Sequence, residues 1–129
     1  MPTNVELAKR MVEIFNSNVF YDLAEVLAED ARHTCPGSDF GAELQGRQAI
    51  IDYFQQGVIT AFDKVSFDIV NLYEDASQST VIIEWRSHIF PKSGKNYSNT
   101  GAFFIVCKDG KIVWVREYFD TELSNKMVN

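Results

Sequence analysis

The chain has 129 residues, of which 46% are hydrophobic and 13% aromatic, which is enough for one domain with a sizeable core. Its formal net charge of -6 and the lack of any Lys or Arg run argue against a nucleic-acid or anionic-membrane partner. The first ten residues lack a signal-peptide pattern, and no apolar run approaches the ~20 residues of a spanning helix. We therefore expect a single cytoplasmic domain over residues 1–129, with Cys35 and Cys107 as free thiols.

Three amphipathic helices are expected in the first half of the chain, where apolar residues recur at spacings of three and four. They lie within residues 4–18, 21–31 and 49–62. Thr3 or Asn4 serves as the cap of the first helix. Between the second and third helices, residues 31–35 are predicted as a short strand. A loop from Pro36 to about Gln45 then forms a candidate rim.

The second half of the chain changes to the alternating period of β-strands. The expected strands cover residues 65–69, 80–90, 101–107 and 111–119, and residues 121–128 could close with a helical turn. Asp109 and Gly110 lie between the last two strands and predict a tight hairpin. Helices first and antiparallel strands after predict an α+β domain, with helices on one face of a curved sheet.

The candidates for chemistry are Glu117, Arg86 and His88. Glu117 shares a strand face with valines, so it is either a solvated rim residue or a carboxylate in a pocket, where desolvation favours proton transfer. Arg86 and His88 share a face of the strand over residues 80–90. In one interpretation Arg86 keeps Glu117 ionised at the floor of a pocket, and His88 carries protons. In the other, the charges form a solvated outer face with a cross-strand ion pair.

His33 and Cys35 are two residues apart and share a face of the short early strand. A thiolate nucleophile assisted by His33 is one interpretation, and an inert buried cysteine beside a structural histidine is the other. Trp85, Trp114 and Tyr118 are predicted opposite the charged face, either as core or as an oligomer interface. The two histidines and two cysteines have no metal-ligand spacing, and there is no Gly-rich phosphate loop, so we expect no cofactor.

The order of these elements and three short stretches resemble one known family. The stretches are Gly46–Ile50 at the start of the third helix, Asp109–Ile112 in the hairpin, and Arg116–Asp120 after it. Over nearly the whole chain they resemble the SnoaL-like branch of the nuclear transport factor 2-like superfamily. The resemblance implies a cone-shaped α+β barrel of the cystatin-like type. Three N-terminal helices would pack on a curved, mainly antiparallel sheet around an apolar cavity. It also implies a homodimer, since superfamily members commonly dimerise through the sheet.

The resemblance leaves the activity open, because this superfamily includes polyketide cyclases, ketosteroid isomerase, limonene-epoxide hydrolase, scytalone dehydratase and non-enzymatic modules. Against the Asp-Arg-Asp triad of limonene-epoxide hydrolase, Arg86 matches the arginine, whereas His88 and Glu117 stand in place of the aspartates. The aspartates of ketosteroid isomerase correspond to positions near Cys35 and Ala102, so that mechanism is not expected. For SnoaL-type cyclases, Glu117 is the nearest match to the acid/base carboxylate.

We therefore expect a cofactor-independent lyase, isomerase or hydrolase that acts on a small hydrophobic oxygenated molecule. Glu117 would be its base or acid, Arg86 its electrostatic partner and His88 its proton donor. The alternative is a non-catalytic module that binds a small ligand, or a dimerisation scaffold of the same fold.

Overall fold

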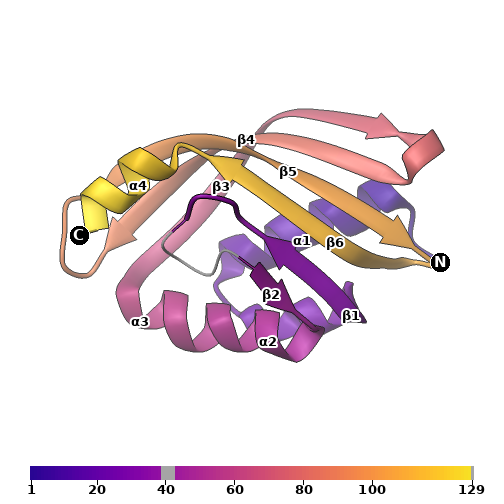
Figure 1. The fold of residues 1–129 in the computed structure, drawn as a ribbon, viewed down its shortest axis with the longest axis horizontal. Helices are drawn as coiled ribbons and strands as arrows, with labels where there is room; N and C mark the ends of the chain where they lie inside the picture. Colours follow the sequence, from indigo (N-terminus) through magenta and orange to yellow (C-terminus); the bar gives the residue numbers. More distant parts are fainter. Residues whose placement is uncertain (39–42, 129) are drawn as a thin grey trace.

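The centre of the computed structural model, which describes residues 1–38 and 43–128, is a curled six-stranded sheet (Figure 1). Its strand order is β2-β1-β6-β5-β4-β3. The strands are β1 (Leu27–Thr34), β2 (Glu43–Gln45), β3 (Phe62–Asp75), β4 (Thr80–Pro91), β5 (Tyr97–Lys108) and β6 (Lys111–Phe119). Neighbouring strands are antiparallel except β1 and β6, which run parallel. This parallel pair joins the first long strand of the chain to the last.

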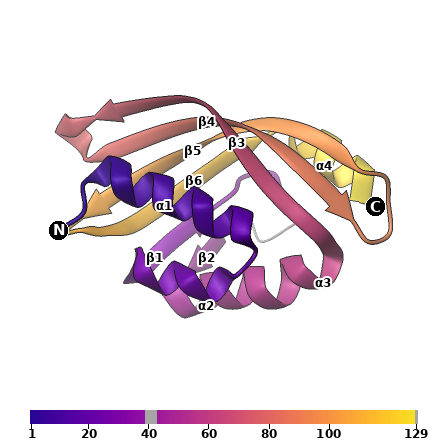
Figure 2. The ribbon, with the colours of Figure 1, turned by 180° about the vertical axis from the view of Figure 1, so that it is seen from behind.

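Four α-helices accompany the sheet within the described residues: α1 (Asn4–Ser17), α2 (Arg47–Asp52), α3 (Ile59–Ala61) and α4 (Thr121–Val128). Two 3-10 turns, η1 (Phe20–Glu25) and η3 (Ala76–Gln78), and a π-helical turn, η2 (Tyr53–Val58), lie between them. The sheet arches over α1, α2 and α3, whereas α4 lies apart at the end that holds the C-terminus (Figure 1). Seen from behind, α1 runs along the sheet beneath β3 and β4 (Figure 2).

Helix α1 is held at both ends by local signals in its sequence. Thr3 Oγ1 accepts a hydrogen bond from the Glu6 amide at 3.1 Å, and the Glu6 carboxylate accepts one from the Thr3 amide at 3.2 Å. Asn18 ends the helix in the left-handed conformation, with φ of 59°. Between these caps, Leu7 and Met11 belong to an apolar stripe that is buried against the sheet.

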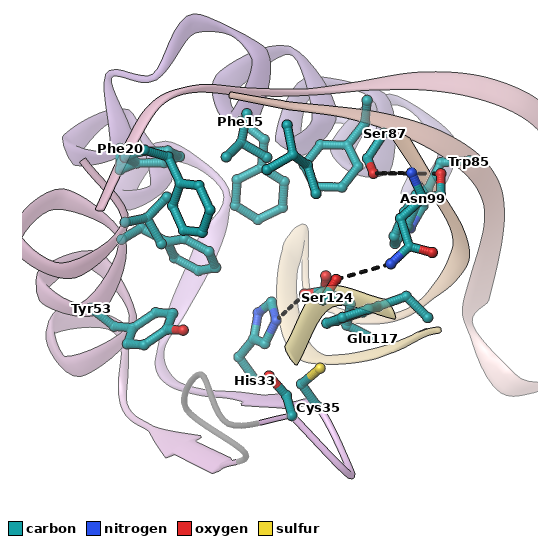
Figure 3. Close-up of a pocket in the computed structure, with 18 of the residues that line it drawn as sticks. Phe15, Phe20, His33, Cys35, Tyr53, Trp85, Ser87, Asn99, Glu117 and Ser124 are labelled. Atoms are coloured by element: carbon teal, nitrogen blue, oxygen red, sulfur yellow. Dashed lines mark hydrogen bonds and ion pairs between the residues drawn. The ribbon is translucent and has the colours of Figure 1, made fainter. Parts of the chain in front are cut away.

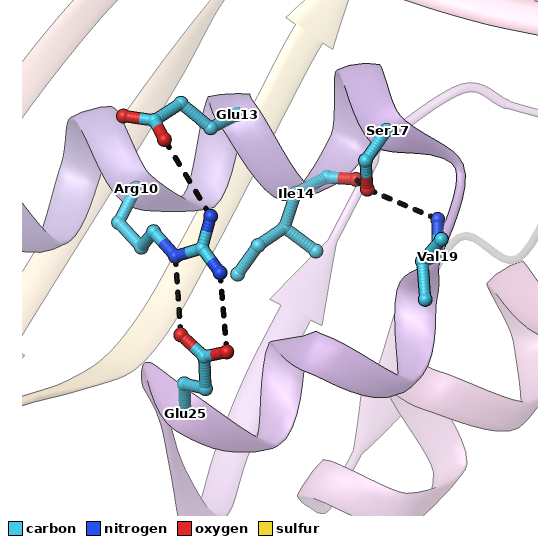
Figure 4. A network of polar contacts seen from close by, with 6 residues as sticks. All are labelled: Arg10, Glu13, Ile14, Ser17, Val19 and Glu25. Atoms are coloured by element: carbon cyan, nitrogen blue, oxygen red, sulfur yellow. Dashed lines mark hydrogen bonds and ion pairs between the residues drawn. The ribbon is translucent and has the colours of Figure 1, made fainter.

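A polar contact fixes η1 against α1. The Arg10 Nε and Nη2 atoms donate to the two carboxylate oxygens of Glu25, each at 3.1 Å (Figure 4). The Arg10 Nη1 atom also lies 3.5 Å from the Glu13 carboxylate. The hydrogen bonds from Arg10 lower the pKa of Glu25. These side chains are exposed, so water screens their charges and the pair adds little to the free energy of folding. The two parallel hydrogen bonds mainly fix the orientation of η1 relative to α1.

The predicted α+β class, the strands and the C-terminal helix are confirmed, with three differences in detail. The second helix, predicted over residues 21–31, is only the 3-10 turn η1, and residues 27–31 belong to strand β1 instead. The third helix is interrupted by η2, which widens the helix where its side chains meet the pocket described below. Strand β2 was not predicted, since its three residues are too few and too polar to show a period. Part of the predicted rim loop, residues 39–42, lies outside the described residues. No helix in the described chain is long and apolar enough to span a membrane.

Candidate functional site

A pocket with a volume of about 120 Å³ lies between the concave face of the sheet and the helical layer (Figure 3). Its wall is mainly aromatic, with side chains from α1, η1, η2, β3, β4 and β6. These aromatic residues include Phe15, Phe20, Phe54, Phe67, Trp85 and Phe119. Several of the rings pack against one another; the Phe67 and Trp85 ring centroids, for example, are 4.9 Å apart. The pocket is therefore a hollow between aromatic side chains that also pack against one another.

A glycine lets the Trp85 ring lie close to the sheet. Gly101 on β5 is the direct partner of Trp85 on β4. A Cβ atom at Gly101 would collide with the Tyr118 carbonyl oxygen and with the six-membered ring of Trp85. The indole therefore covers the backbone of its neighbour and forms one wall of the pocket, where its Nε1 atom is buried without a hydrogen-bond partner among the described residues.

A buried acid and a buried imidazole meet in this pocket. The His33 Nε2 atom lies 2.9 Å from the Glu117 Oε1 atom, and the two side chains are 5% and 15% exposed (Figure 3). The parallel pairing of β1 with β6 brings these residues together. When the Glu117 carboxylate is ionised it only accepts hydrogen bonds, and His33 is then the donor. The Phe54 ring packs edge-on against the imidazole at 5.5 Å and helps to fix its orientation.

The groups around this pair remain protonated near neutral pH. Burial, and to a lesser degree the Glu117 charge, raises the pKa of Cys35 to about 12. The same two causes raise the pKa of Tyr53 above its usual range. Glu117 Oε2 and His33 Nδ1 have no hydrogen-bond partner in the part of the chain that the structure describes. The pair thus retains acceptor atoms that can take a proton from a ligand.

Cys35 is expected to be unreactive in the folded protein. With a pKa of about 12, roughly one thiol in 10,000 is ionised at pH 8, and only the thiolate attacks an alkylating reagent. Iodoacetamide at pH 8 should therefore leave Cys35 intact under native conditions, whereas both cysteines should react in urea, as mass spectrometry would show. Rapid native alkylation at Cys35 would instead support the interpretation of this residue as a nucleophile.

A second polar group of side chains lies in the same wall as Trp85. Ser87 Oγ accepts from the Asn99 amide at 3.2 Å, and Asn99 Nδ2 donates to both the Asp120 carbonyl and Ser124 Oγ at 2.9 Å (Figure 3). Tyr97 Oη lies 3.3 Å from Ser124 Oγ. Through Asn99, this network attaches α4 to β5 and brings a hydroxyl of the last helix to the pocket.

The predicted clustering of Arg86 and His88 with Glu117 is wrong. Between Val81 and Ser87 the buried residues of β4 are Val81, Ile83, Trp85 and Ser87, so Arg86 and His88 lie on the opposite, outer face. The His88 Nε2 atom is 2.7 Å from the Asp68 carboxylate on β3, a cross-strand contact of the kind that the alternative interpretation predicted. Of the three candidates, Glu117 alone lines the pocket.

The aromatic residues predicted to share one face are also divided between two. Trp85 lines the pocket, whereas Trp114 packs on the outer side of the sheet, with the guanidinium groups of Arg32 and Arg116 each 4.6 Å from its ring centroid. Tyr118 is 44% exposed. Dimerisation through the sheet stays a prediction.

Sequence reasoning missed most of the polar residues of the pocket. The sequence places His33 beside Cys35 but not beside Glu117, because nothing in a short stretch of sequence indicates which parallel strand will become its neighbour. Asn99, Tyr97 and Ser124 lie at a strand start and on the last helix, where polar residues are ordinary. The one available signal was the alternation in β5, which places Tyr97, Asn99 and Gly101 on the same face as the buried Phe103.

Several solved structures share this fold along nearly the full chain. A nuclear transport factor 2-like protein of unknown function from Burkholderia pseudomallei has a TM-score of 0.88 and 18% identity, covering 100% of this chain and 99% of its own. TerC, co-crystallised with polyporic acid, has a TM-score of 0.85 and 16% identity, covering 97% of each chain. A candidate polyketide cyclase from Xanthomonas campestris pv. campestris has a TM-score of 0.83 and 21% identity, covering 98% and 96%. No curated protein sequence matches.

A family model also matches the sequence directly. The model describes a SnoaL-like domain and aligns with residues 8–115, from within α1 to within β6. The matched region includes His33, all of the helical layer except the first residues of α1, and most of the sheet. This match covers well over half of the chain and agrees with the structural similarities. The chain therefore belongs to the SnoaL-like domain family.

Proposed function

We propose that this chain is an enzyme that moves a proton within a small, hydrophobic, oxygenated molecule, with Glu117 as the general base. The observation that carries the proposal is the pair of Glu117 and His33, 2.9 Å apart, in a pocket whose wall is otherwise mainly aromatic. Clefts of this composition with a few convergent polar groups are the usual setting of small-molecule sites. A buried carboxylate in them is suited to proton transfer.

The two residues have different tasks in this proposal. The His33 N–H holds Glu117 Oε1 and so fixes the plane of the carboxylate, which leaves Oε2 to accept a proton from carbon or oxygen of the ligand. The pocket wall is mainly aromatic, and among the described residues His33 is the one side chain that hydrogen-bonds the carboxylate. Isomerisation, elimination and ring closure can all begin with such a transfer, and none of them requires a cofactor for this step.

The pocket volume limits what can enter. An engineered protein cavity of about 150 Å³ is known to hold benzene, so a pocket of about 120 Å³ holds roughly one ring, with the rest of a larger molecule in the opening. The structural relatives support small-molecule chemistry as well. They include TerC with polyporic acid, the candidate polyketide cyclase and a candidate isomerase from Bacillus subtilis.

A base-catalysed ring opening tests the proposal without knowledge of the natural substrate. In nitrobenzisoxazole, a base removes the ring C–H proton, the N–O bond breaks and a coloured nitrile phenolate forms. We expect the protein to open this ring at least about 100-fold faster than acetate at equal concentration, because a positioned general base contributes at least that factor. The rate is read from the absorbance of the phenolate.

The controls separate the pocket from the outer face. The Arg86→Ala variant should open the ring at the wild-type rate, because Arg86 lies on the outer side of β4. A wild-type rate equal to that of acetate would contradict the proposal and favour the alternative, a non-catalytic module that binds a small ligand.

A further inference from the structure

In the second polar group of the pocket, one hydroxyl proton has no acceptor among the described residues. Asn99 Nδ2 uses its two protons on the Asp120 carbonyl and on Ser124 Oγ. Tyr97 and Ser124 then share one contact at 3.3 Å, in which one hydroxyl donates to the other. Whichever hydroxyl donates, the proton of the other has no acceptor among the described residues. One O–H donor in the pocket wall is therefore left over.

Three further observations agree with this proton count. Ser124 is 4% exposed, so bulk water cannot readily satisfy its hydroxyl. Trp85, 2% exposed in the same wall, adds an indole N–H that also has no acceptor among the described residues. Burial raises the pKa of Tyr97, which keeps its phenol protonated and able to donate. Buried donors are nearly always paired, so what this wall lacks is an acceptor.

The charges around the pocket indicate which kind of ligand group could accept this hydrogen bond. No residue that lines the described part of the pocket is Lys or Arg, and Glu117 contributes a carboxylate. A carboxylate or phosphate on the ligand would therefore enter beside a like charge with no cation to neutralise it. A neutral carbonyl oxygen meets the same donors without this cost.

We propose that the Tyr97–Ser124 hydroxyl pair recognises a neutral carbonyl oxygen of the ligand and is the specificity-determining contact of this pocket. The inference rests on the proposed function, since it takes the ligand of Glu117 and His33 to be the molecule that is held. Ser124 comes from α4, so the last helix supplies part of the recognition site. The ring of the ligand lies among the aromatic side chains, with its carbonyl toward β5 and α4 and its mobile proton toward β6.

Two probes that differ mainly at the carbonyl test this contact. Acetophenone carries the carbonyl, and ethylbenzene has a similar shape without it. The double variant Tyr97→Phe/Ser124→Ala should bind acetophenone about three- to tenfold more weakly than the wild type, which is the usual effect of one hydrogen bond. Its affinity for ethylbenzene should not change. Affinities are measured by NMR titration.

The single variants give a result that a purely structural role would not produce. Tyr97→Phe leaves the Ser124 hydroxyl as a donor, and Ser124→Ala leaves that of Tyr97. Each single variant should therefore bind acetophenone within about twofold of the wild type, and only the double variant should lose the contact. The infrared carbonyl band of bound acetophenone should shift to higher frequency in the double variant alone. Tyr118→Phe/Ser98→Ala, changed at exposed positions of the same types, is the matched control.

Three results would overturn the inference: equal weakening of both probes in the double variant, unchanged acetophenone binding in it, or no binding of either probe to the wild type. The first would mean damaged packing, the second a carbonyl held elsewhere, and the third a pocket closed to such molecules. These results are independent of the ring-opening assay. A protein that binds acetophenone through this pair but does not open nitrobenzisoxazole would refute the proposed enzyme and keep the recognition contact.

Discussion

Replacement of Glu117 by Gln should lower kcat/KM for the opening of nitrobenzisoxazole by about 100- to 10,000-fold, the range that a positioned general base contributes. The amide has nearly the same shape as the carboxylate, and its oxygen can still accept the hydrogen bond from His33. The melting temperature should therefore change little. Absorbance kinetics and a thermal melt on the same preparation measure both effects.

Glu84→Gln is the matched control for the Glu117→Gln variant. Glu84 also lies on a strand, but on the exposed outer face of β4, where it accepts a hydrogen bond from Asn71 at 2.7 Å. Glu84→Gln removes the same charge from the protein and should retain the full rate. Equal rates in the wild type and the Glu117→Gln variant would show that another group is the base.

The largest effect on stability is expected from Phe103→Ala. Phe103 is 0% exposed and its ring packs against the rings of Phe15, Phe67 and Trp85 at centroid distances of 5.2–5.8 Å. Removal of a buried aromatic ring leaves a cavity that the surrounding rings fill only in part. The free energy of unfolding should fall by about 3–5 kcal/mol, as measured by urea denaturation.

The neighbouring residue provides the control for this variant. Phe104 points to the outer face of the same strand, where its ring contacts Tyr118 and the Arg116 guanidinium. Its replacement by Ala should cost about 1 kcal/mol or less, because the ring is only half-buried and its outer-face contacts are weak. Similar losses in the two variants would contradict the assignment of the inner and outer faces of β5.

The sequence predicted the elements well because their signals are local. The capping residues of α1, the period of the strands and the Asp109-Gly110 turn each act within a few residues, and the structure agrees with them. Which face of a strand becomes the inside is not a local property. Alternation divides β4 into two faces. The predicted cluster requires the face with Arg86 and His88 to be the inner one, whereas three ionisable residues in a row are typical of a face exposed to water.

On β6, the sequence correctly indicates that Glu117 lies in a pocket. A single carboxylate among apolar residues, as at Glu117, costs free energy to bury and therefore indicates a special site. Its partner could not be read from the sequence, because His33 reaches it only through the parallel neighbour β1. The polar contacts of Ser124 depend in turn on where α4 folds back, which no pattern in residues 121–128 defines.

The parallel pairing of β1 with β6 has a consequence for folding. The strands from β3 to β6 can pair one after another as hairpins, each with a short loop, whereas β1 and β6 are brought together across 84 residues between His33 and Glu117. Contacts at such separations carry a large loop-closure entropy and form late. A partly folded chain that holds only its hairpins would therefore lack the acid–imidazole pair. The proposed base, Glu117, would therefore meet its imidazole partner only after β1 has paired with β6.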